Sequence, residues 1–410
     1  MVLVKFFMCL ILKGILAEEN ATKYPSNIQL WRAEGDFDED VLTEFYDRAR
    51  FTEEIWKRDN RTIDFLIYKE EAKSIAEFLD DHNVTHKVLV EDVQGKVDEA
   101  FVKTFPTRRN AMSGDKFTWT AYPSLGDINK YLAKMAATYP AHVSLTSIGT
   151  TYKRKPINML KISNGNKGNR PVLIDSGIHG RERTSVLSTL YFIDSIVHNF
   201  TKQPEYINKR DWHVIPVLNP DGYDYSINTD HLWRKNRHRF SGECYGVDLN
   251  RNFDYNWGKK ESSQVVCNSD FCGTHPFSEE ETKAFKNLVE GTHYIGYISV
   301  HSAGSKIVYP FATMQSHNED FRDHLQMTKE MGLAMRKVAG TRFTNGNVQS
   351  LGLPKIFGMS IDWMYYVNEI KHSYMIETRG YGGLDILDAK KILAAVKEVR
   401  AGIFRFAQLH

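Results

Sequence analysis

The chain has 410 residues, of which 42% are hydrophobic and 25% are charged. This is the composition of a soluble globular protein, and the length is sufficient for two or three domains. The formal net charge is only +2, so no global charge indicates a nucleic-acid partner. The charge is uneven, however: residues 20–109 carry 14 Lys+Arg and 20 Asp+Glu, whereas residues 110–410 carry 37 and 29. An acidic part therefore precedes a basic part, and the two could attract each other.

Residues 1–18 have the pattern of a secretory signal peptide. Basic Lys5 precedes an apolar run, and the small residues Gly14 and Ala17 follow it. An N-terminal strand or helix is the alternative, because Lys13 interrupts the apolar run. No later stretch approaches the ~20 apolar residues that a membrane span needs. We therefore expect a secreted, extracellular protein without a membrane span.

Residues 20–100 alternate strand-like and helix-like patterns, which predicts a small α+β domain. The next segment, residues 101–116, reads "FVKTFPTRRNAMSGDK" and contains several residues that favour loops. We expect it to be a linker that a trypsin-like protease cleaves near Arg108 and Arg109. A solvated basic pair is the alternative for these two arginines.

From residue 117 to residue 410, short apolar runs alternate with long amphipathic stretches. This pattern predicts one α/β domain, with a mixed, mostly parallel sheet and helices on both faces. The predicted strands are residues 156–163, 171–177, 211–218, 294–300 and 373–378. The predicted helices are residues 124–138, 185–200, 278–290, 318–338 and 388–408.

Four side chains with metal or acid–base chemistry follow or end predicted strands. His179 and Glu182 come just after the strand at 171–177, in "DSGIHGRERTS". His301 and Glu377 end two other strands. Binding crevices in α/β sheets form beyond the carboxyl ends of strands, so these residues are expected to meet. His179 and Glu182 alone could equally be two polar residues on a surface turn.

Two histidines and one glutamate suit a catalytic zinc ion, because three protein ligands leave the fourth position for water. Zinc lowers the pKa of that water and polarises a carbonyl group. A nearby carboxylate can then take the proton of the water, and Glu377 is the candidate base.

Seven sequence blocks occur in an order that resembles a known family. They are "IHGRE", "NPDGYDY", "HLWRKNR", "GVDLNRNF", "SVHS", "SIDW" and "IETRGYG". Together they are similar to the signature blocks of the M14 zinc carboxypeptidases of the pancreatic A/B type. "IQLWRAE", before the linker, is similar to the activation propeptide of that family. The resemblance covers nearly the whole chain.

The resemblance implies a secreted zymogen with one Zn²⁺ per chain, which would be a monomer and would hydrolyse the C-terminal bond of peptides and proteins. It assigns His179, Glu182 and His301 to the metal and Glu377 to the general base. It also implies roles for five further residues: Arg234 (carbonyl polarisation and oxyanion), Asn250, Arg251 and Arg181 (the C-terminal carboxylate of the substrate), and Asp248 (orientation of a zinc-bound histidine).

Among the cysteines, Cys9 lies in the expected signal peptide, which leaves three. One disulfide and one spare thiol is the simplest interpretation for an exported chain. The resemblance implies that Cys244 pairs with Cys267. It matches Cys272 to a cysteine whose partner is missing here, so we expect a free, buried and inert thiol.

The chain departs from the family on the substrate side. A mobile-loop Tyr of the family aligns with Pro354, and an aromatic residue after the second histidine is replaced by Ala303. Ile361 matches the floor of the specificity pocket and implies apolar C-terminal residues. Met359 and Met375 would narrow that pocket, so aliphatic residues are expected to fit better than bulky aromatic ones.

Two other functions stay open at this stage. A catalytically weak or silent relative could keep the fold and only bind C-terminal peptides, which the missing Tyr makes conceivable. The retained Glu377 argues against it, because a silent binder needs no base. A relative that hydrolyses a different amide is the other alternative, and the retained Asn250 and Arg251 argue for peptide C-termini instead.

Overall fold

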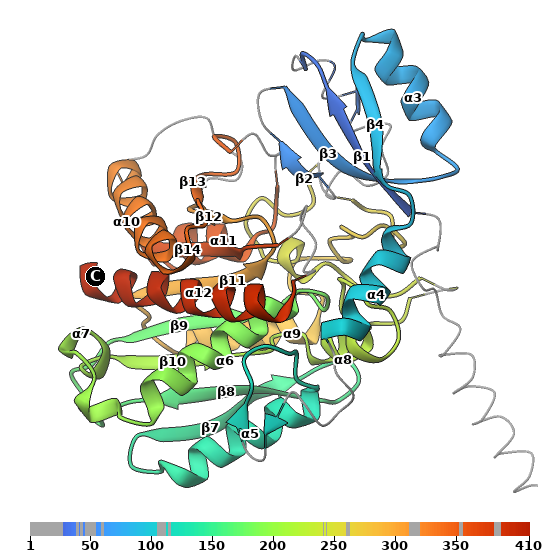
Figure 1. The fold of residues 1–410 in the computed structure, drawn as a ribbon. Coiled ribbons are helices and arrows are strands. Elements are labelled where there is room, and N and C mark those ends of the chain that lie inside the picture. Colours follow the sequence, from blue (N-terminus) through green and yellow to red (C-terminus); the bar gives the residue numbers. More distant parts are fainter. Residues whose placement is uncertain are drawn as a thin grey trace, which may run out of the picture.

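The computed structural model shows two lobes of unequal size (Figure 1). It describes residues 28–37, 41, 44–45, 55–58, 61–104, 112–113, 116–240, 242, 244–259, 263–310, 320–351, 356–380 and 387–410. The expected signal peptide and the expected cleavage site at Arg108 and Arg109 lie outside these residues. Within the described part, no helix is long and apolar enough to cross a membrane.

The smaller, N-terminal lobe contains a four-stranded antiparallel sheet in the order β2-β3-β1-β4. The strands are β1 (Ile28–Glu34), β2 (Ile55–Arg58), β3 (Thr62–Tyr68) and β4 (Thr85–Val90). Helix α3 (Ala72–Asp81) contributes Ile75, Phe78 and Leu79 to a core shared with β1 and β3. This is the small α+β unit that the alternating patterns predict.

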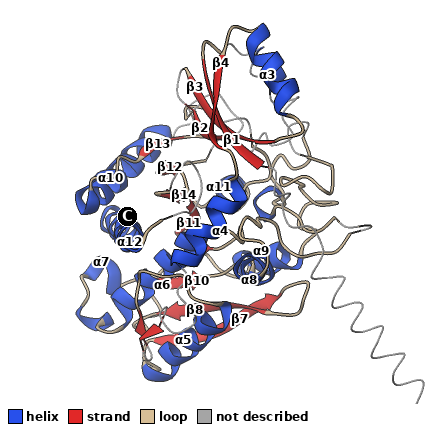
Figure 2. Cartoon of the chain, turned by 45° about the vertical axis from the view of Figure 1, so that its right-hand side comes forward, coloured by secondary structure: helices blue, strands red, loops and turns tan. Residues whose placement is uncertain are grey.

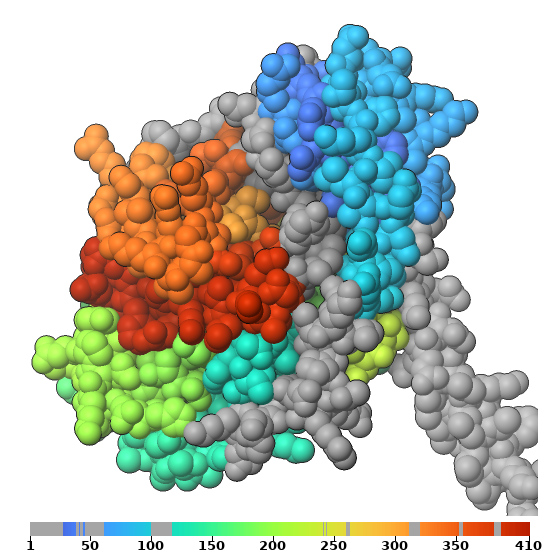
Figure 3. Space-filling view, in the orientation of Figure 1, coloured from blue at the N-terminus to red at the C-terminus, as the bar shows by residue number. Residues whose placement is uncertain are grey.

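The two lobes meet through an apolar contact. Helix α4 (Val93–Thr104) runs from the smaller lobe down one side of the larger lobe (Figure 1). Val93 and Val97 of α4 pack with residues of β1 and β3 and with Leu232 of the larger lobe in one buried cluster. In the space-filling view the blue N-terminal lobe stands against one side of the larger lobe (Figure 3).

The larger lobe is built on an eight-stranded sheet in the order β13-β12-β14-β11-β9-β10-β8-β7. Its strands are β7 (Val143–Thr150), β8 (Pro156–Ile162), β9 (Pro171–Ser176), β10 (Asp211–Ile215), β11 (Gly296–Ser302), β12 (Lys306–Val308), β13 (Thr344–Gly346) and β14 (His372–Thr378). The central strands β14, β11, β9 and β10 are parallel, whereas β8, β7 and the pair β12–β14 are antiparallel. Strands β5 (Met112–Ser113) and β6 (Lys116–Phe117) form a separate small hairpin.

Helices cover both faces of this sheet (Figure 2). The helices are α5 (Leu125–Thr138), α6 (Arg183–Val197), α7 (Glu205–Asn208), α8 (Pro220–Asn228), α9 (Glu280–Glu290), α10 (Phe321–Ala339), α11 (Ser360–Tyr366) and α12 (Ala389–Leu409), with short 3₁₀ turns at Phe200–Lys202 and Leu249–Arg251. Helices α5, α6, α10 and α12 share one core with the sheet. Helices α9 and α11 share a second core on the other face.

The predicted fold class is therefore confirmed, and the predicted strands and helices correspond to elements of the structure within a few residues. Several elements were not predicted, among them β7, β12, β13, α8 and α11. Strand β7 lies at a sheet edge, and all its residues except Val143 are exposed or half-exposed, so its sequence lacks the long apolar run of a central strand. Strands β12 and β13 have three residues each, too few for a periodic pattern.

Candidate metal centre

The side chains that could bind a metal project from one edge of the central sheet. The chain leaves β9 after Ser176 and turns through a tight loop that carries His179 and Glu182 before α6 begins. Only glycine fits at position 180 of this loop, because a Cβ there would lie 2.4 Å from the carbonyl oxygen of Gly222. Two polar side chains are thereby held against the end of the adjacent strand β11, where His301 lies.

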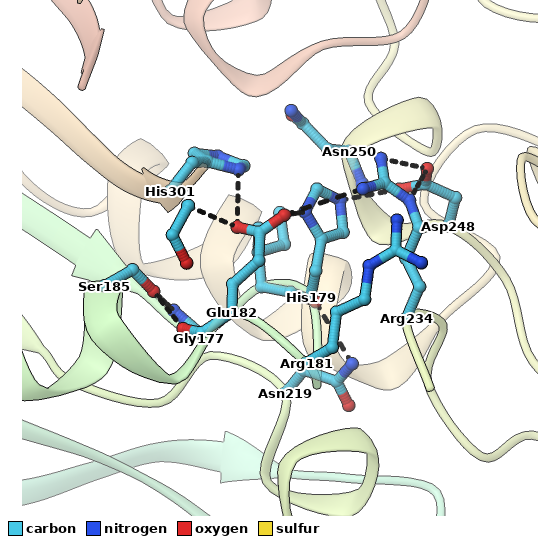
Figure 4. A network of polar contacts seen from close by, with 12 residues as sticks. Gly177, His179, Arg181, Glu182, Ser185, Asn219, Arg234, Asp248, Asn250 and His301 are labelled. Carbon is cyan, nitrogen blue, oxygen red and sulfur yellow. Dashed lines mark hydrogen bonds and ion pairs between the residues drawn. The ribbon is translucent and has the colours of Figure 1, made fainter. Parts of the chain in front are cut away.

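His179, Glu182 and His301 converge, as Figure 4 shows. One ligand atom from each lies within 4.8 Å of the others, and all three side chains are buried. Glu182 contacts both histidines, with Oε1 2.6 Å from Nδ1 of His179 and Oε2 3.1 Å from Nδ1 of His301. Two imidazoles and one carboxylate form a donor set that fits zinc and leaves one coordination position open.

The opposite charges in this cluster stabilise one another. Burial opposes ionisation of Glu182, but the facing His179 and His301 outweigh it and hold the pKa of Glu182 well below its usual range. Burial likewise lowers the pKa of His301, but Glu182 outweighs this effect and the pKa is raised. Buried charges are stable only when paired or bound to a metal, so the three side chains belong to one electrostatic unit.

Asp248 fixes the orientation of the first histidine. Its Oδ1 lies 3.0 Å from Nε2 of His179, which leaves Nδ1 to face the metal position. Its Oδ2 accepts two hydrogen bonds from Arg234, at 2.9 Å from Nε and 2.7 Å from Nη2. Burial raises the pKa of Asp248, but Arg234 and Arg251 outweigh it, so the carboxylate remains ionised.

The second histidine has its own oriented contacts, which were not predicted. Nε2 of His301 lies 3.0 Å from Oγ of Ser299, and this hydroxyl donates to Oδ1 of Asp175 at 3.0 Å. Asp175 is fully buried, and its burial raises its pKa to about 6. One signal was present in the sequence, because an Asp near the end of the buried run "PVLIDS" needs a polar partner inside the protein.

Glu377 lies beside the metal-binding side chains. It is the register partner of His301 on the neighbouring parallel strand β14. Burial raises the pKa of Glu377, and the charge of His301 partly offsets this effect. A carboxylate next to a metal position is suited to accept the proton of a metal-bound water.

The residues expected to bind a carboxylate lie on the Asp248 side of the centre. Asn250 and Arg251 are buried in the 3₁₀ turn that follows Asp248. Nη1 of Arg251 donates to the carbonyl oxygen of Asn250 at 2.8 Å, and Oδ1 of Asn250 accepts from the backbone N–H of Ser360 at 3.0 Å. Arg181, from the same loop as His179, extends toward Arg234 and Asp248 in Figure 4 and donates to the carbonyl oxygen of Leu232 at 3.4 Å.

Ser360 begins α11, and Ile361 follows it in the core on this face of the sheet. Met359 and Met375 belong to the same buried cluster as Ile361. Ile361, Met359 and Met375 therefore lie in the same apolar core, and the backbone of the neighbouring Ser360 contacts Asn250. Pro354, which aligns with the missing Tyr, lies outside the described residues.

The cysteines follow the expected pattern. Cys244 and Cys267 form a disulfide. Cys272 is a free, buried thiol whose burial raises its pKa to about 11. A thiol with a raised pKa is a weak nucleophile, which agrees with the expectation of an inert Cys272.

Comparison with known proteins agrees with this geometry. Residues 128–402 match the family model of zinc carboxypeptidases, and residues 40–100 match that of the carboxypeptidase activation peptide. The chain is 31% identical to carboxypeptidase A1 of Mus musculus over 82% of this chain and 81% of that protein. It is 29% identical to zinc carboxypeptidase A 1 of Anopheles gambiae over 78% of this chain and 73% of that protein.

Solved structures have the same fold. Carboxypeptidase A from Helicoverpa armigera superimposes with a TM-score of 0.87 at 24% identity, over 94% of this chain and 98% of that chain. Thrombin-activatable fibrinolysis inhibitor superimposes with a TM-score of 0.79 at 27% identity, over 93% and 98%.

Proposed function

This chain belongs to the zinc carboxypeptidase family and is a metallocarboxypeptidase with an activation peptide, and we propose that it is a secreted zymogen that removes apolar residues from peptide C-termini. The observation that supports this proposal best is the buried His179–Glu182–His301 cluster with Glu377 beside it. A protein that only binds peptides has no use for a raised-pKa carboxylate at that position.

We assign the metal ligands and the base as follows. His179, Glu182 and His301 would hold one zinc ion, which lowers the pKa of a bound water and polarises a carbonyl oxygen. Glu377 accepts the proton of the attacking water and later returns it to the leaving amine. Asp248 and Ser299 keep the two imidazole rings in the tautomer that points a nitrogen at the metal.

Arginine side chains supply the positive charge that the reaction requires. Arg234, aligned by its two hydrogen bonds to Asp248, is assigned to the oxyanion that develops on the scissile carbonyl. Arg251 and Asn250 are assigned to the free C-terminal carboxylate, with Arg181 as an accessory contact. A planar guanidinium binds a carboxylate through two parallel hydrogen bonds, which explains selection of a chain end over an internal bond.

The apolar group at the start of α11 is assigned to the C-terminal side chain. Ile361 offers no charge for Lys or Arg, and it is 1% exposed. Met359 and Met375 take up space in the same cluster, which favours Leu, Ile, Val or Met over larger aromatic residues.

We assign to the N-terminal lobe the role of keeping the enzyme inactive before cleavage. The acidic lobe docks on the basic larger lobe through α4, and cleavage near Arg108 and Arg109 by a trypsin-like protease would release it. Residues 1–18 would direct secretion. The active form is assigned as a monomer.

A C-terminal substrate profile tests the proposal. Trypsin-treated protein is incubated with blocked dipeptides ending in Leu, Phe or Arg, with and without a zinc chelator. Release of Leu should be the fastest, and the chelator should abolish it. Glu377→Gln should lower kcat by about 10²- to 10⁴-fold while zinc content stays at one per chain. Zinc binding without any hydrolysis would favour the silent peptide binder, and faster release of Arg would contradict the assigned specificity.

A further inference from the structure

A lysine lies beside the proposed base. Lys306 begins β12 and is the direct antiparallel partner of Glu377 on β14. Directly opposed residues of an antiparallel pair project from the same face, with Cβ atoms about 5 Å apart. A Cβ built on Gly304 would lie 3.4 Å from Cβ of Glu377 and 3.4 Å from Nζ of Lys306. The ammonium group is therefore turned toward the metal-binding edge of the sheet.

No described residue pairs with this ammonium group at hydrogen-bond or ion-pair distance. Lys306 is half-buried, and this burial lowers its pKa, while the charge of Glu377 raises it. A cation that is partly removed from water is stabilised by a nearby negative charge. Glu377 supplies part of that negative charge, but its carboxylate is also assigned to proton transfer.

The position of Lys306 differs from that of the other site cations. Along the sheet, β12 lies on one side of the metal ligands and is followed by β14, β11 and β9. Arg234 and Arg251 contact Asp248, which contacts His179 beyond β9. Strands are spaced by about 4.8 Å, so the start of β12 is about 14 Å from the end of β9. An extended peptide that is held by its carboxylate on the Asp248 side reaches Lys306 only with residues upstream of the scissile bond.

We propose that Lys306 selects peptides that carry an acidic side chain one or two residues upstream of the scissile bond. This inference rests on the proposed function and adds a second selective contact to it. The C-terminal residue is selected by size at Ile361, and the upstream residue is selected by charge at Lys306. An alternative is that Lys306 acts only on Glu377, in which case the charge of the substrate has no effect.

Matched peptides test the inference. The full-length chain after limited trypsin treatment is given blocked tripeptides ending in Leu, with Glu or its neutral isostere Gln at each upstream position. We expect kcat/KM to be about tenfold higher for Glu at one of these positions, as for two charges a few ångströms apart near a protein surface. The preference should decrease as salt is added. Equal rates for the Glu and Gln peptides would overturn the inference and leave the proposed function intact.

Three variants test whether the preference for Glu depends on the side chain of Lys306. Lys306→Met keeps the length and apolar stem but removes the charge, so the Glu-to-Gln ratio should fall to about one. Lys306→Arg should retain the preference. Lys167→Met, at an exposed loop lysine, serves as the matched control and should leave the ratio unchanged. The ratio compares two peptides in the same preparation, so a partly misfolded variant does not distort it. An unchanged ratio in Lys306→Met would contradict the assignment.

A binding measurement covers the case in which no peptide is cleaved. The Glu377→Gln protein is titrated with fluorescent forms of the same Glu and Gln peptides. Tighter binding of the Glu peptide, lost in the double variant with Lys306→Met, would support the inference even if the hydrolytic function fails. Equal binding of both peptides would overturn it.

Discussion

At the scale of single residues, Asp248 connects the two sides of the candidate site. It accepts from Arg234 and contacts His179, so one buried carboxylate orients both a proposed metal ligand and the proposed oxyanion contact. Asp248→Asn keeps the shape but removes the charge. We expect zinc affinity to fall about 10- to 100-fold, as for the loss of other outer contacts of a metal ligand. Chelator competition measures this change, and Asp254→Asn, at an exposed position, should have no effect.

Met375 allows a test of pocket size at the same scale. Met375→Ala removes side-chain volume from the cluster around Ile361. We expect the ratio of kcat/KM for C-terminal Phe to that for Leu to rise by roughly 10-fold or more, since single methylene groups change selectivity by 10- to 200-fold. Met327→Ala is the matched control, because Met327 has the same 6% exposure but packs in the core on the other face of the sheet. A change of equal size in both variants would contradict the assignment of Met375 to the pocket.

At the scale of secondary-structure elements, a histidine cluster joins β14, α10 and α12. His324 lies in α10, His372 begins β14 and His410 is the C-cap residue of α12, and burial lowers the pKa of each to about 4. Both His324 and His372 contact the hydroxyl of Tyr374, at 3.2 Å. The unfolded chain binds protons near the ordinary histidine pKa of about 6.5, whereas the folded chain resists protonation until pH 4. The contribution of these histidines to the free energy of unfolding is therefore fully present above about pH 6.5 and is lost as the pH falls toward 4.

Urea unfolding at pH 7.5 and pH 5 measures this dependence. The contribution of fully buried His324 should be on the order of 2 kcal/mol between these pH values. His324→Gln removes the titrating group and should make the free energy of unfolding less dependent on pH. His198→Gln, at a more exposed histidine, should leave the dependence as it is. Identical pH dependence in both variants would show that His324 does not contribute.

Much of the site at this scale could be predicted from sequence. Buried runs mark the central strands, and parallel strands bring their carboxyl ends to one edge, so the sequence predicts that His179, Glu182, His301 and Glu377 meet. Their assignment as metal ligands and base comes from the family resemblance. Ser299 and Asp175 were missed because their link crosses between two strands, and strand order is not encoded in a local pattern. Lys306 was missed for the same reason, since its pairing with Glu377 depends on the register of a three-residue strand.

At the scale of the whole molecule, the proposed latency depends on the contact between the lobes. Val97 of α4 lies in the buried cluster with Leu232 and is 5% exposed. Val97→Asp places a charge in that cluster and should weaken docking, so the uncut chain should gain activity toward a Leu-terminated dipeptide. The ratio of activity before and after trypsin treatment measures the effect. Lys96→Ala, on the exposed side of the same helix, should leave the uncut chain as latent as the wild type.

The presence of a small α+β lobe before a larger α/β lobe could be predicted from composition and pattern, because an acidic segment with alternating elements precedes a basic one. The docking contact could not be predicted in this way, because Leu232 occurs in a loop block, "HLWRKNR", in which only Arg234 has an expected role. An apolar residue in a loop shows no periodicity, and its partners on α4 and β1 are more than 100 residues away along the chain.

The metal ligands themselves are distant in sequence, and this has a consequence for how the protein is made. Glu182 accepts a hydrogen bond from the backbone of Ser302, next to His301 and 120 residues later in the chain. The entropic cost of closing a loop grows only slowly with its length, so this separation is compatible with a stable cluster. Pairing of β9 with β11 brings the two parts of the cluster together. We therefore expect zinc to be bound tightly only once these strands have paired, so that tight zinc uptake during refolding would mark the completion of the central sheet.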